Sequence, residues 1–229
     1  GALTQYMTHP EEWTYHIPEG MTTMEGALVE PAAVGMHAAV LGGAQPGKSI
    51  VILGGGTIGL MVLQACISLG ATDITVVDVI EKRLELAKKL GAARVINGKE
   101  EDTVAVLRSE EMYGDHGVDL VFEAAGAVFT AQQAVQIVSR GGKIMMVGTQ
   151  SKPVPIDFLK INREVTIQTS FRYCNNFPQT IEAISSGRFN VKDMVTNIYD
   201  YEDVQKAFEE AIDPVKKTEM VKGVIKVAE

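Results

Sequence analysis

The stretch that decides the fold is SIVILGGGTIG, from Ser49 to Gly59. An apolar, largely β-branched run leads into a Gly-x-Gly-x-x-Gly pattern at Gly54, Gly56 and Gly59, and the apolar run that follows predicts a helix. In this context the first glycine permits a tight turn, the second lets the backbone approach a pyrophosphate, and the third lets helix and strand pack closely. The helix N-terminus then offers free N–H groups and a positive dipole end to the diphosphate. The stretch therefore predicts a dinucleotide-binding strand–turn–helix unit.

Strand-like runs alternate with helical patterns from this unit onward. Their nearly all-apolar centres are typical of strands that helices cover on both faces, as in parallel sheets. The sequence predicts an α/β protein with a six-stranded, doubly wound parallel sheet of the Rossmann type. The expected strands are Ser49–Leu53, Asp73–Asp78, Arg94–Ile96, Val118–Glu123, Lys143–Gly148 and Glu164–Ser170, and the expected helices between them are Ile58–Leu69, 80–90, Asp102–Met112 and Val128–Val138.

The two ends of the chain have a different pattern. Residues 1–41 contain a short strand-like piece, Leu3–Met7, and a predicted helix over Glu25–Leu41. Residues 172–229 contain predicted helices and a terminal strand, at Pro178–Ser186, Asp203–Ile212 and 221–227. Neither end has enough apolar pattern for a core of its own, and 229 residues amount to about one and a half ordinary domains. We therefore expect one complete domain, residues 42–171, between two partial segments, 1–41 and 172–229.

Composition excludes several classes of function. Apolar residues make up 46% of the chain and charged residues 22%, as in ordinary globular proteins. A formal net charge of −8 disfavours binding to nucleic acid or to an anionic membrane, and no apolar run is long enough for a membrane span. Two cysteines cannot form a disulfide scaffold, so we expect a cytoplasmic protein. The start has no signal-peptide pattern and no initiator Met, so we expect a fragment or a processed chain.

A second glycine motif has the letters of a P-loop but the wrong context. The run GGAQPGKS, Gly42–Ser49, fits the Gly-x-x-x-x-Gly-Lys-Ser pattern. A P-loop follows a strand and begins a helix, whereas here a predicted helix precedes the run and a predicted strand follows it. We interpret the run as a reverse turn that leads into the first strand.

Two charged residues after the second strand point to the cofactor. Asp78 lies 19 residues beyond Gly59, at the expected end of that strand. A carboxylate there can accept hydrogen bonds from both ribose hydroxyls and would repel a 2′-phosphate, while Arg83 could lie over the adenine. These features favour NAD over NADP. The alternatives are a helix cap for Asp78 and a solvated helix face for Arg83.

Several strings beyond the fingerprint resemble the zinc-dependent medium-chain dehydrogenases, and within them the sorbitol (polyol) branch. They are GALTQY at the start, EGALVEPAAVGMHA (Glu25–Ala38), VFEAAGA (Val121–Ala127), GGKIMMVG (Gly141–Gly148) and REVTIQTSFRYCNNFP (Arg163–Pro178). The last string, with Phe-Arg-Tyr-Cys-Asn, is the most specific. The resemblance covers essentially the whole chain and implies that its two ends belong to a GroES-like catalytic domain.

The resemblance also implies roles for individual residues. With the glycine motif and Asp78, the expected cofactor-binding residues are Gly54, Gly56, Thr57, Ile58, Gly59, Asp78, Arg83, Val147, Gly148, Thr149, Ser170 and Phe171. Arg172 and Tyr173 would contact the substrate, although Arg172 could instead form an ion pair at a subunit interface. Glu30 would reach a catalytic zinc directly or through its water; read alone, it is a helix-interior Glu before Pro31.

Most of the catalytic domain expected from the family lies outside this sequence. Family members take a Cys, a His and a Glu for the catalytic zinc, and a proton-relay hydroxyl, from a region before the first residue of this chain. The four histidines have no metal-ligand spacing, so we expect no zinc on the chain alone. The family usually has a Cys-Thr or similar polar pair where this chain has Ala124 and Ala125, which puts a side-chain hydrogen bond from that loop in doubt.

By resemblance, the complete enzyme oxidises a secondary alcohol of a small polyol to a ketone and passes a hydride to NAD, with zinc as Lewis acid. We expect the 229-residue chain alone to bind NAD without turnover. We also expect a homodimer or homotetramer formed through the edge strand 165–170. Two alternatives stay open. One is a stand-alone NAD(H)-binding regulatory module, and the other is a threonine or butanediol dehydrogenase of the same family.

Overall fold

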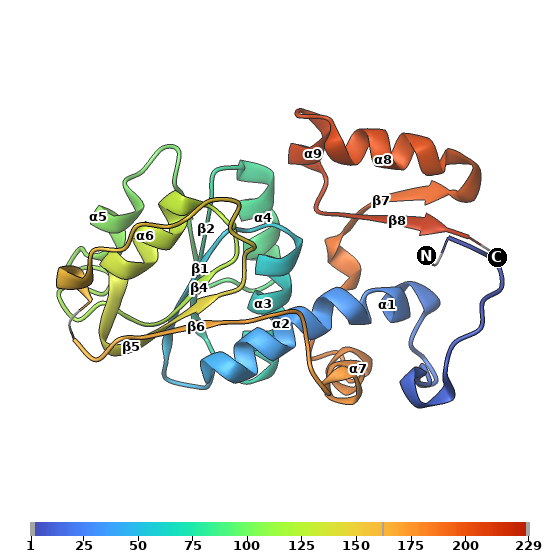
Figure 1. The fold of residues 1–229 in the computed structure, drawn as a ribbon, viewed down its shortest axis with the longest axis horizontal. Helices are drawn as coiled ribbons and strands as arrows, with labels where there is room; N and C mark the ends of the chain where they lie inside the picture. The colour runs from blue at the N-terminus through green and yellow to red at the C-terminus, as the bar shows by residue number, and fades with distance from the viewer. Residues whose placement is uncertain (1–2, 162, 228–229) are drawn as a thin grey trace.

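The computed structural model describes residues 3–161 and 163–227 and contains a six-stranded parallel sheet (Figure 1). The strand order is β3-β2-β1-β4-β5-β6, the order of a doubly wound Rossmann sheet. The strands are β1 (Ser49–Leu53), β2 (Asp73–Asp78), β3 (Arg94–Asn97), β4 (Val118–Glu123), β5 (Val138–Met146) and β6 (Thr166–Thr169). The predicted α/β fold is confirmed, and three of the predicted strands have the predicted bounds.

Helices cover both faces of the sheet and bury it completely at its centre. Helices α2 (Val29–Gly42), α3 (Thr57–Ser68) and α4 (Glu81–Lys89) pack against one face of the sheet and form a single apolar core with it. Helices α5 (Thr103–Leu107) and α6 (Val128–Ile137) pack with the other face in a second core. Burial on two sides explains why the central strands are apolar without alternation. No helix among the described residues is both long enough and apolar enough to cross a membrane.

Helix α2 is joined to the sheet domain by direct backbone contact with α3. A Cβ atom added at Gly35 would lie 2.4 Å from the carbonyl carbon of Met61, so only glycine permits this approach. A short helix, α1 (Thr23–Ala27), precedes α2 and begins with a capping box between Thr22 and Glu25. Helix α7 (Phe177–Ser185) packs on the other side of α2, where Asn176 Nδ2 donates to the Ala33 carbonyl at 2.9 Å.

The C-terminal part forms a small unit beside the sheet domain (Figure 1). Strands β7 (Val195–Asp200) and β8 (Lys222–Lys226) pair in parallel, and α8 (Val204–Ile212) and α9 (Lys216–Glu219) connect them. Salt bridges Lys82–Glu219, at 2.6 Å, and Lys89–Asp193, at 3.1 Å, join α4 to this unit. Single turns of 3-10 helix occur at η1 (Glu11–Trp13), η2 (Phe158–Lys160), η3 (Lys192–Met194) and η4 (Tyr201–Asp203).

Some expectations about elements were wrong. Leu3–Met7 is not a strand, because no described strand pairs with it and its side chains are exposed. Strand β5 spans Val138–Met146 instead of the expected Lys143–Gly148, and its first residues form an irregular part with a register shift against β4. Helix α5 ends at Leu107, earlier than predicted, and β7 was not predicted.

The glycine run before β1 has the predicted context. Gly42 ends α2, and Gly43 caps that helix with a left-handed φ of 77°. The run then turns between Gln45 and Lys48, where Lys48 N donates to the Gln45 carbonyl, and β1 follows. Helix, turn and strand in this order confirm that the run is not a P-loop.

Candidate functional site

The glycine turn between β1 and α3 is shaped by close contacts at two of its three motif positions. Gly54 has a φ of 111°, and a Cβ there would lie 2.8 Å from Ala125 N. A Cβ at Gly59 would lie only 1.8 Å from the Gly54 carbonyl oxygen, so this glycine sets the helix–strand distance. Gly56, the N-cap of α3, is different, because the nearest atom to its added Cβ is Arg83 Nη1 at 3.9 Å. The backbone at Gly56 therefore faces open space, as the approach of a ligand requires.

Asp78 is the last residue of β2, and its nearly buried carboxylate accepts hydrogen bonds from the glycine turn and from the start of α4. Its Oδ2 accepts a hydrogen bond from Gly55 N at 2.7 Å, which fixes the glycine turn. Its Oδ1 accepts from Val79 N at 2.8 Å and Ile80 N at 2.9 Å, so Asp78 also organises the start of α4. Oδ1 already accepts two hydrogen bonds, but Oδ2 accepts one and can accept another, so this structural role is compatible with contact to a ribose.

Arg83 lies between Asp78 and the C-terminal unit. Its Nη1 is 3.7 Å from Asp78 Oδ2, and its Nη2 donates to the Lys217 carbonyl at 3.4 Å. The Arg83 side chain is only 23% exposed, so it does not lie on a solvated helix face, which was the alternative interpretation. Thr57, the first residue of α3, makes a second contact with this unit by donating from its hydroxyl to the Val221 carbonyl.

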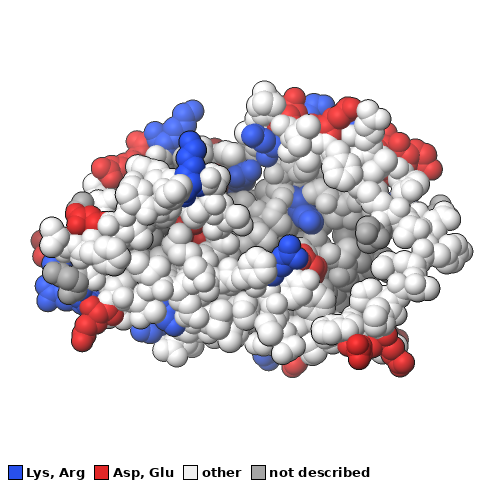
Figure 2. All heavy atoms as spheres, viewed as in Figure 1, with Lys and Arg blue, Asp and Glu red and all other residues white. Residues whose placement is uncertain are grey.

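A cavity of about 370 Å³ opens at the carboxyl edge of the sheet, between the ends of β1, β2 and β4. In open α/β sheets this crevice, where the strand order reverses, is the ligand site. Figure 2 shows the surface hollowed between the sheet domain and the C-terminal unit, with Lys and Arg side chains around the hollow. The cavity is lined by Gly54, Gly56, Val77, Asp78, Val79, Arg83, Gly98, Thr103, Ala124, Ala125, Ala127, Phe129, Thr130 and Gln133.

The loops that follow β4 and β5 are in direct contact. Val147 N and Gly148 N both donate to the Glu123 carbonyl at 2.8 Å. A Cβ at Gly148 would lie 2.3 Å from Gly126 N, and a Cβ at Gly126 would lie 2.6 Å from the Thr149 carbonyl oxygen. Residues Val147–Thr149 therefore lie against the loop that forms one wall of the cavity.

Ser170 and Phe171 lie where the chain leaves the sheet. Ser170 N donates to the Met146 carbonyl at 2.9 Å and so extends the pairing of β6 with β5. The Phe171 ring is 82% exposed, and the Arg172 guanidinium carbon lies 5.5 Å from its centre. Arg172 has a left-handed φ of 51° and forms no salt bridge within the part of the chain that the structure describes.

Glu30, Arg172 and Tyr173, which come from distant parts of the sequence, lie together. Burial raises the pKa of the Tyr173 hydroxyl, the neighbouring Glu30 carboxylate raises it further, and Arg172 opposes the shift. Glu30 is exposed in the first turn of α2, while the Tyr173 ring packs on Phe177 with centres 4.8 Å apart. The predicted zinc-site and substrate residues therefore share one surface.

The described residues do not fit a zinc site by themselves. Among residues 3–161 and 163–227, no group of three or more His, Cys, Asp or Glu side chains could hold a metal ion. Cys66 is buried inside α3, where burial strongly raises the pKa of its thiol, and Cys174 is exposed. A zinc ion at Glu30 would need ligands other than these residues.

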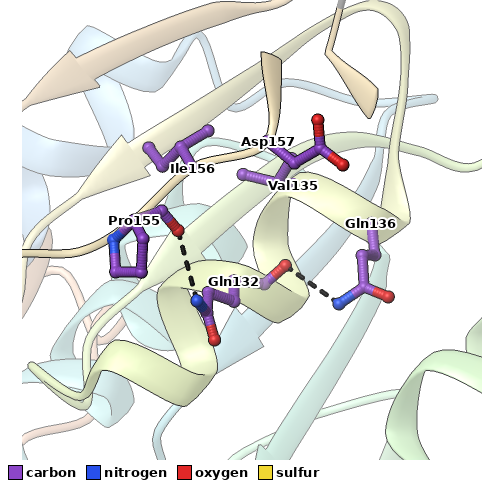
Figure 3. A pocket seen from close by; sticks show the side chains of 6 residues that line it. All are labelled: Gln132, Val135, Gln136, Pro155, Ile156 and Asp157. Carbon is purple, nitrogen blue, oxygen red and sulfur yellow. Dashed lines mark hydrogen bonds between the residues drawn. The ribbon is translucent and has the colours of Figure 1, made fainter. Parts of the chain in front are cut away.

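A second hollow, of about 230 Å³, lies between α6 and the segment before η2 (Figure 3). Its two glutamine side chains bond to groups in its own walls: Gln132 Nε2 donates to the Pro155 carbonyl and Gln136 Nε2 donates to the Gln132 carbonyl, both at 3.2 Å. It adds no residue to the cavity at the carboxyl edge of the sheet.

Sequence reasoning missed Glu123, the last residue of β4. Its side chain is completely buried and accepts hydrogen bonds from Ala125 N, Gly126 N and the Thr130 hydroxyl at Oε1, and from Gln150 Nε2 at Oε2. The loop that lacks a polar pair at Ala124 and Ala125 is thus held through its backbone instead. A carboxylate at the end of an apolar strand, VDLVFE, was the available signal.

The family profile described as zinc-binding dehydrogenase matches residues 57–186, which include α3, most of the cavity lining and the loops after β4 and β5. The chain belongs to the zinc-binding dehydrogenase family. Among curated proteins, the uncharacterised zinc-type alcohol dehydrogenase-like protein YdjJ of Escherichia coli K12 is 62% identical over all of this chain and 65% of its own length. The sorbitol dehydrogenase of Bacillus subtilis 168 is 39% identical over 93% of this chain and 60% of its own length.

Solved structures agree with the fold. An Escherichia coli oxidoreductase/dehydrogenase of unknown specificity, described as involved in membrane biogenesis, is 62% identical, with a TM-score of 0.93 over 96% of this chain and 62% of its own. The 2R,3R-butanediol dehydrogenase of Bacillus subtilis is 29% identical, with a TM-score of 0.84 over 93% of this chain and 60% of its own. This chain therefore spans less than two thirds of the length of these relatives.

Proposed function

We propose that this chain binds NAD(H) in the cavity at the carboxyl edge of the sheet and supplies the cofactor half of a zinc-dependent polyol or secondary-alcohol dehydrogenase. The observation on which the proposal depends is the arrangement of Asp78 and the glycine turn, joined by the bond from Gly55 N to Asp78 Oδ2. The α3 N-terminus beside them offers N–H groups to a diphosphate, and the cavity of about 370 Å³ is of the size of small-ligand sites.

The preference for NAD over NADP is supported by the charge at the ribose end. The Asp78 carboxylate, only 9% exposed, would repel a 2′-phosphate. Arg83 is already directed toward Asp78 and the Lys217 carbonyl, and the two residues after Asp78 are apolar. Arg83, the cation in the cavity lining, is therefore already engaged by Asp78 and the Lys217 carbonyl rather than free to bind a 2′-phosphate.

In this proposal, each part of the cofactor and the substrate contacts a different group of residues of this chain. The N-terminus of α3, from Gly56 to Ile58, binds the diphosphate, while Asp78 and Arg83 hold the adenosine end. Val147–Thr149, Ser170 and Phe171 border the nicotinamide, and Arg172 and Tyr173 orient the substrate hydroxyls beside Glu30. NAD, when bound there, supplies the acceptor for a hydride from the carbinol carbon. Because the described residues do not hold zinc, we assign them no metal-dependent step.

The relatives favour a polyol as substrate. The sorbitol dehydrogenase of Bacillus subtilis is named for a polyol, and the D-xylulose reductase of Morganella morganii, 33% identical over 94% of this chain, is named for a ketose. The likeness to a butanediol dehydrogenase keeps a simpler secondary alcohol, or threonine, as the alternative within the family. A regulatory NAD(H)-binding module is the alternative outside enzyme catalysis.

The decisive experiment is calorimetric titration of the 229-residue chain with NAD⁺ and, separately, with NADP⁺. We expect NAD⁺ to bind more tightly, and we expect no NADH to form when sorbitol, xylitol or 2,3-butanediol is added to the isolated chain. Absence of NAD⁺ binding would refute the proposed function. NADH formation by the isolated chain would refute only the statement that it lacks turnover.

A further inference from the structure

The carboxylate of Glu123 lies inside the sheet domain, at the junction of two loops. It ends β4, in the centre of the sheet, and is 0% exposed. No Lys, Arg or His of the described residues lies within salt-bridge distance of it. Burial of a carboxylate without a cation is unfavourable unless hydrogen bonds replace its water, so an apolar side chain would suit the core better. The position of this residue therefore requires a reason beyond packing.

The two oxygens of this carboxylate bind different loops. Oε1 accepts from Ala125 N at 3.0 Å, Gly126 N at 2.9 Å and the Thr130 hydroxyl at 2.7 Å, all in the loop after β4 or the first turn of α6. Oε2 accepts from Gln150 Nε2 at 2.7 Å, in the loop after β5. Each loop is thus tied to the same rigid group by charge-assisted hydrogen bonds.

The loop after β4 lines the cavity, and the loop after β5 packs against that loop. The loop after β4 contributes Ala124, Ala125 and Ala127 to the cavity that also contains Asp78. A Cβ added at Gly54 would lie 2.8 Å from Ala125 N, so this loop packs directly against the glycine turn and limits its position. The loop after β5 contains Val147–Thr149 and is held against the first loop by Glu123 and by the close approach of the glycines at positions 126 and 148.

We propose that Glu123 is a positioning residue that couples the two halves of the dinucleotide cleft. Through Oε1 it holds the wall on the adenosine side, and through Oε2 and Gln150 it holds the loop on the nicotinamide side in the matching position. The inference rests on the proposed dinucleotide site. Its consequence is selective: loss of the link to Gln150 weakens binding of the whole dinucleotide but leaves binding of the adenosine half unchanged.

Gln150→Met tests the link, because it removes the donor to Oε2 and leaves the three bonds to Oε1 in place. We expect 5′-AMP to bind this variant with an affinity within about twofold of that of the unchanged chain, and NADH to bind roughly tenfold more weakly or worse. The fluorescence of bound NADH should shift toward that of free NADH, because the nicotinamide environment is lost. Hydrogen exchange should become faster at the Val147 and Gly148 amides and stay unchanged at Ala125 and Gly126.

Exchange of the carboxylate and the amide between positions 123 and 150 supplies the matched control. Gln150→Glu alone places two carboxylates against each other and should reduce NADH affinity at least as much as Gln150→Met. The double variant Glu123→Gln/Gln150→Glu reverses the direction of this hydrogen bond. The side-chain amide N–H at position 123 can donate to the carboxylate at position 150, and the side-chain carbonyl at position 123 can accept from the loop after β4. NADH affinity should recover to within about threefold of the original, which is the coupling that a double-mutant cycle measures.

Four results would overturn the inference. They are unchanged NADH affinity in Gln150→Met, equal loss of AMP and NADH affinity, failure of the double variant to recover, and unchanged exchange in the loop after β5. Failure of the unchanged chain to bind either AMP or NADH would overturn the proposed function as well. Binding of both ligands by the unchanged chain, with no effect of Gln150→Met, would overturn the coupling alone.

Discussion

Gly56 and Gly59 belong to one turn, yet a side chain has different consequences at each. At Gly59 a Cβ would overlap the Gly54 carbonyl oxygen at 1.8 Å, so Gly59→Ala must move α3 away from β1. We expect Gly59→Ala to lower the free energy of unfolding by about 1–3 kcal/mol. Urea titration followed by circular dichroism measures the loss, and a stability equal to that of the unchanged chain would contradict the contact.

Gly56→Ser is the matched variant in the same turn. Gly56 has an ordinary φ of −72° at the N-cap of α3, where serine is among the preferred residues, and the space beside it is open. We expect the free energy of unfolding to stay within about 0.5 kcal/mol of the original. NAD⁺ binding should nevertheless fall by roughly tenfold, because the side chain occupies the space of the pyrophosphate. Calorimetry on both variants separates the folding role from the binding role.

Asp78 is the residue at which cofactor choice can be tested. We expect Asp78→Ala to weaken NAD⁺ binding roughly tenfold or more, since it removes the ribose acceptor and the bond to Gly55 N. NADP⁺ binding should fall less, because the repulsion of its 2′-phosphate is also removed. Glu182→Ala, a change on α7 away from the cavity, is the control with unchanged affinity for both. An unchanged NAD⁺ affinity in Asp78→Ala would exclude Asp78 from the site.

The sequence predicted those residues whose roles follow from local pattern. The glycine turn and Asp78 could be proposed as cofactor residues because a motif fixes both their types and their spacing, and the structure brings them together through the bond from Gly55 N to Asp78 Oδ2. Glu123 was missed because its four donors come from residues 125 to 150, and no local pattern shows that they converge. The proximity of Glu30 to Tyr173 is also a tertiary fact, since 143 positions separate them in the chain.

At the scale of elements, the sequence predicted the bounds of the buried strands most accurately, and the strand it missed, β7, is half exposed. Strands β1, β2 and β4 are continuous apolar runs, and their bounds were predicted correctly. Strand β7 alternates between exposed residues and residues that are partly or fully buried. Its partner β8 begins 22 residues after β7 ends, so no local pattern indicates the pairing. The strand expected at Leu3–Met7 has suitable residues but no described partner, and pairing rather than propensity decides whether a strand forms.

Strand β6 is one of the two edge strands of the six-stranded sheet and has exposed apolar side chains on it and beside it. Ile167 is 38% exposed, and Phe158, Leu159 and Phe171, in the segments before and after the strand, are more so. We propose that 165–170 pairs with the same strand of a second copy. Analytical ultracentrifugation at micromolar concentration should show a dimer, and Ile167→Lys should convert it to a monomer. Ile212→Lys, on exposed α8, is the control that leaves the dimer intact. A monomeric unchanged chain would contradict the proposal.

The starts of β1 and β4 are joined by a carboxylate whose effect depends on pH. Asp119 Oδ2 accepts from Ser49 N at 2.9 Å and from the Ser49 hydroxyl at 3.0 Å. Burial pushes the pKa of Asp119 upward, but these hydrogen bonds outweigh it and hold the pKa below the ordinary 3.8. Because the folded pKa is the lower one, the stabilisation is present above that ordinary value and is lost as pH falls through the folded pKa.

Asp119→Ala should therefore destabilise the chain at neutral pH and have a smaller effect at strongly acidic pH. Urea unfolding of both proteins at the two pH values measures the difference, with Glu182→Ala as a control that shows no such trend. A gap between Asp119→Ala and the unchanged chain that stays constant down to pH values well below 3.8 would contradict the assigned cause.

At the scale of the whole molecule, the described chain is a Rossmann-type sheet domain with segments on both sides that converge near Glu30. Because no cluster within the described ranges can hold a metal ion, we expect EDTA to leave the melting temperature and NAD⁺ affinity of the chain unchanged. Differential scanning calorimetry with and without chelator checks this. Stoichiometric zinc in the purified chain, together with a lower melting temperature after chelation, would show that the chain holds zinc by itself.

The contact of Gly35 with the Met61 backbone has a mechanical consequence. Helix α2 has Glu30 at its beginning and is pressed at its middle against α3, whose own beginning is the glycine turn. The two helices therefore form one rigid unit. We expect Glu30 to move together with the glycine turn in any opening movement, with the hinge outside α2 and α3. The angle of α2 against α3 is therefore not free to adapt to a group that approaches Glu30 and Tyr173 from outside.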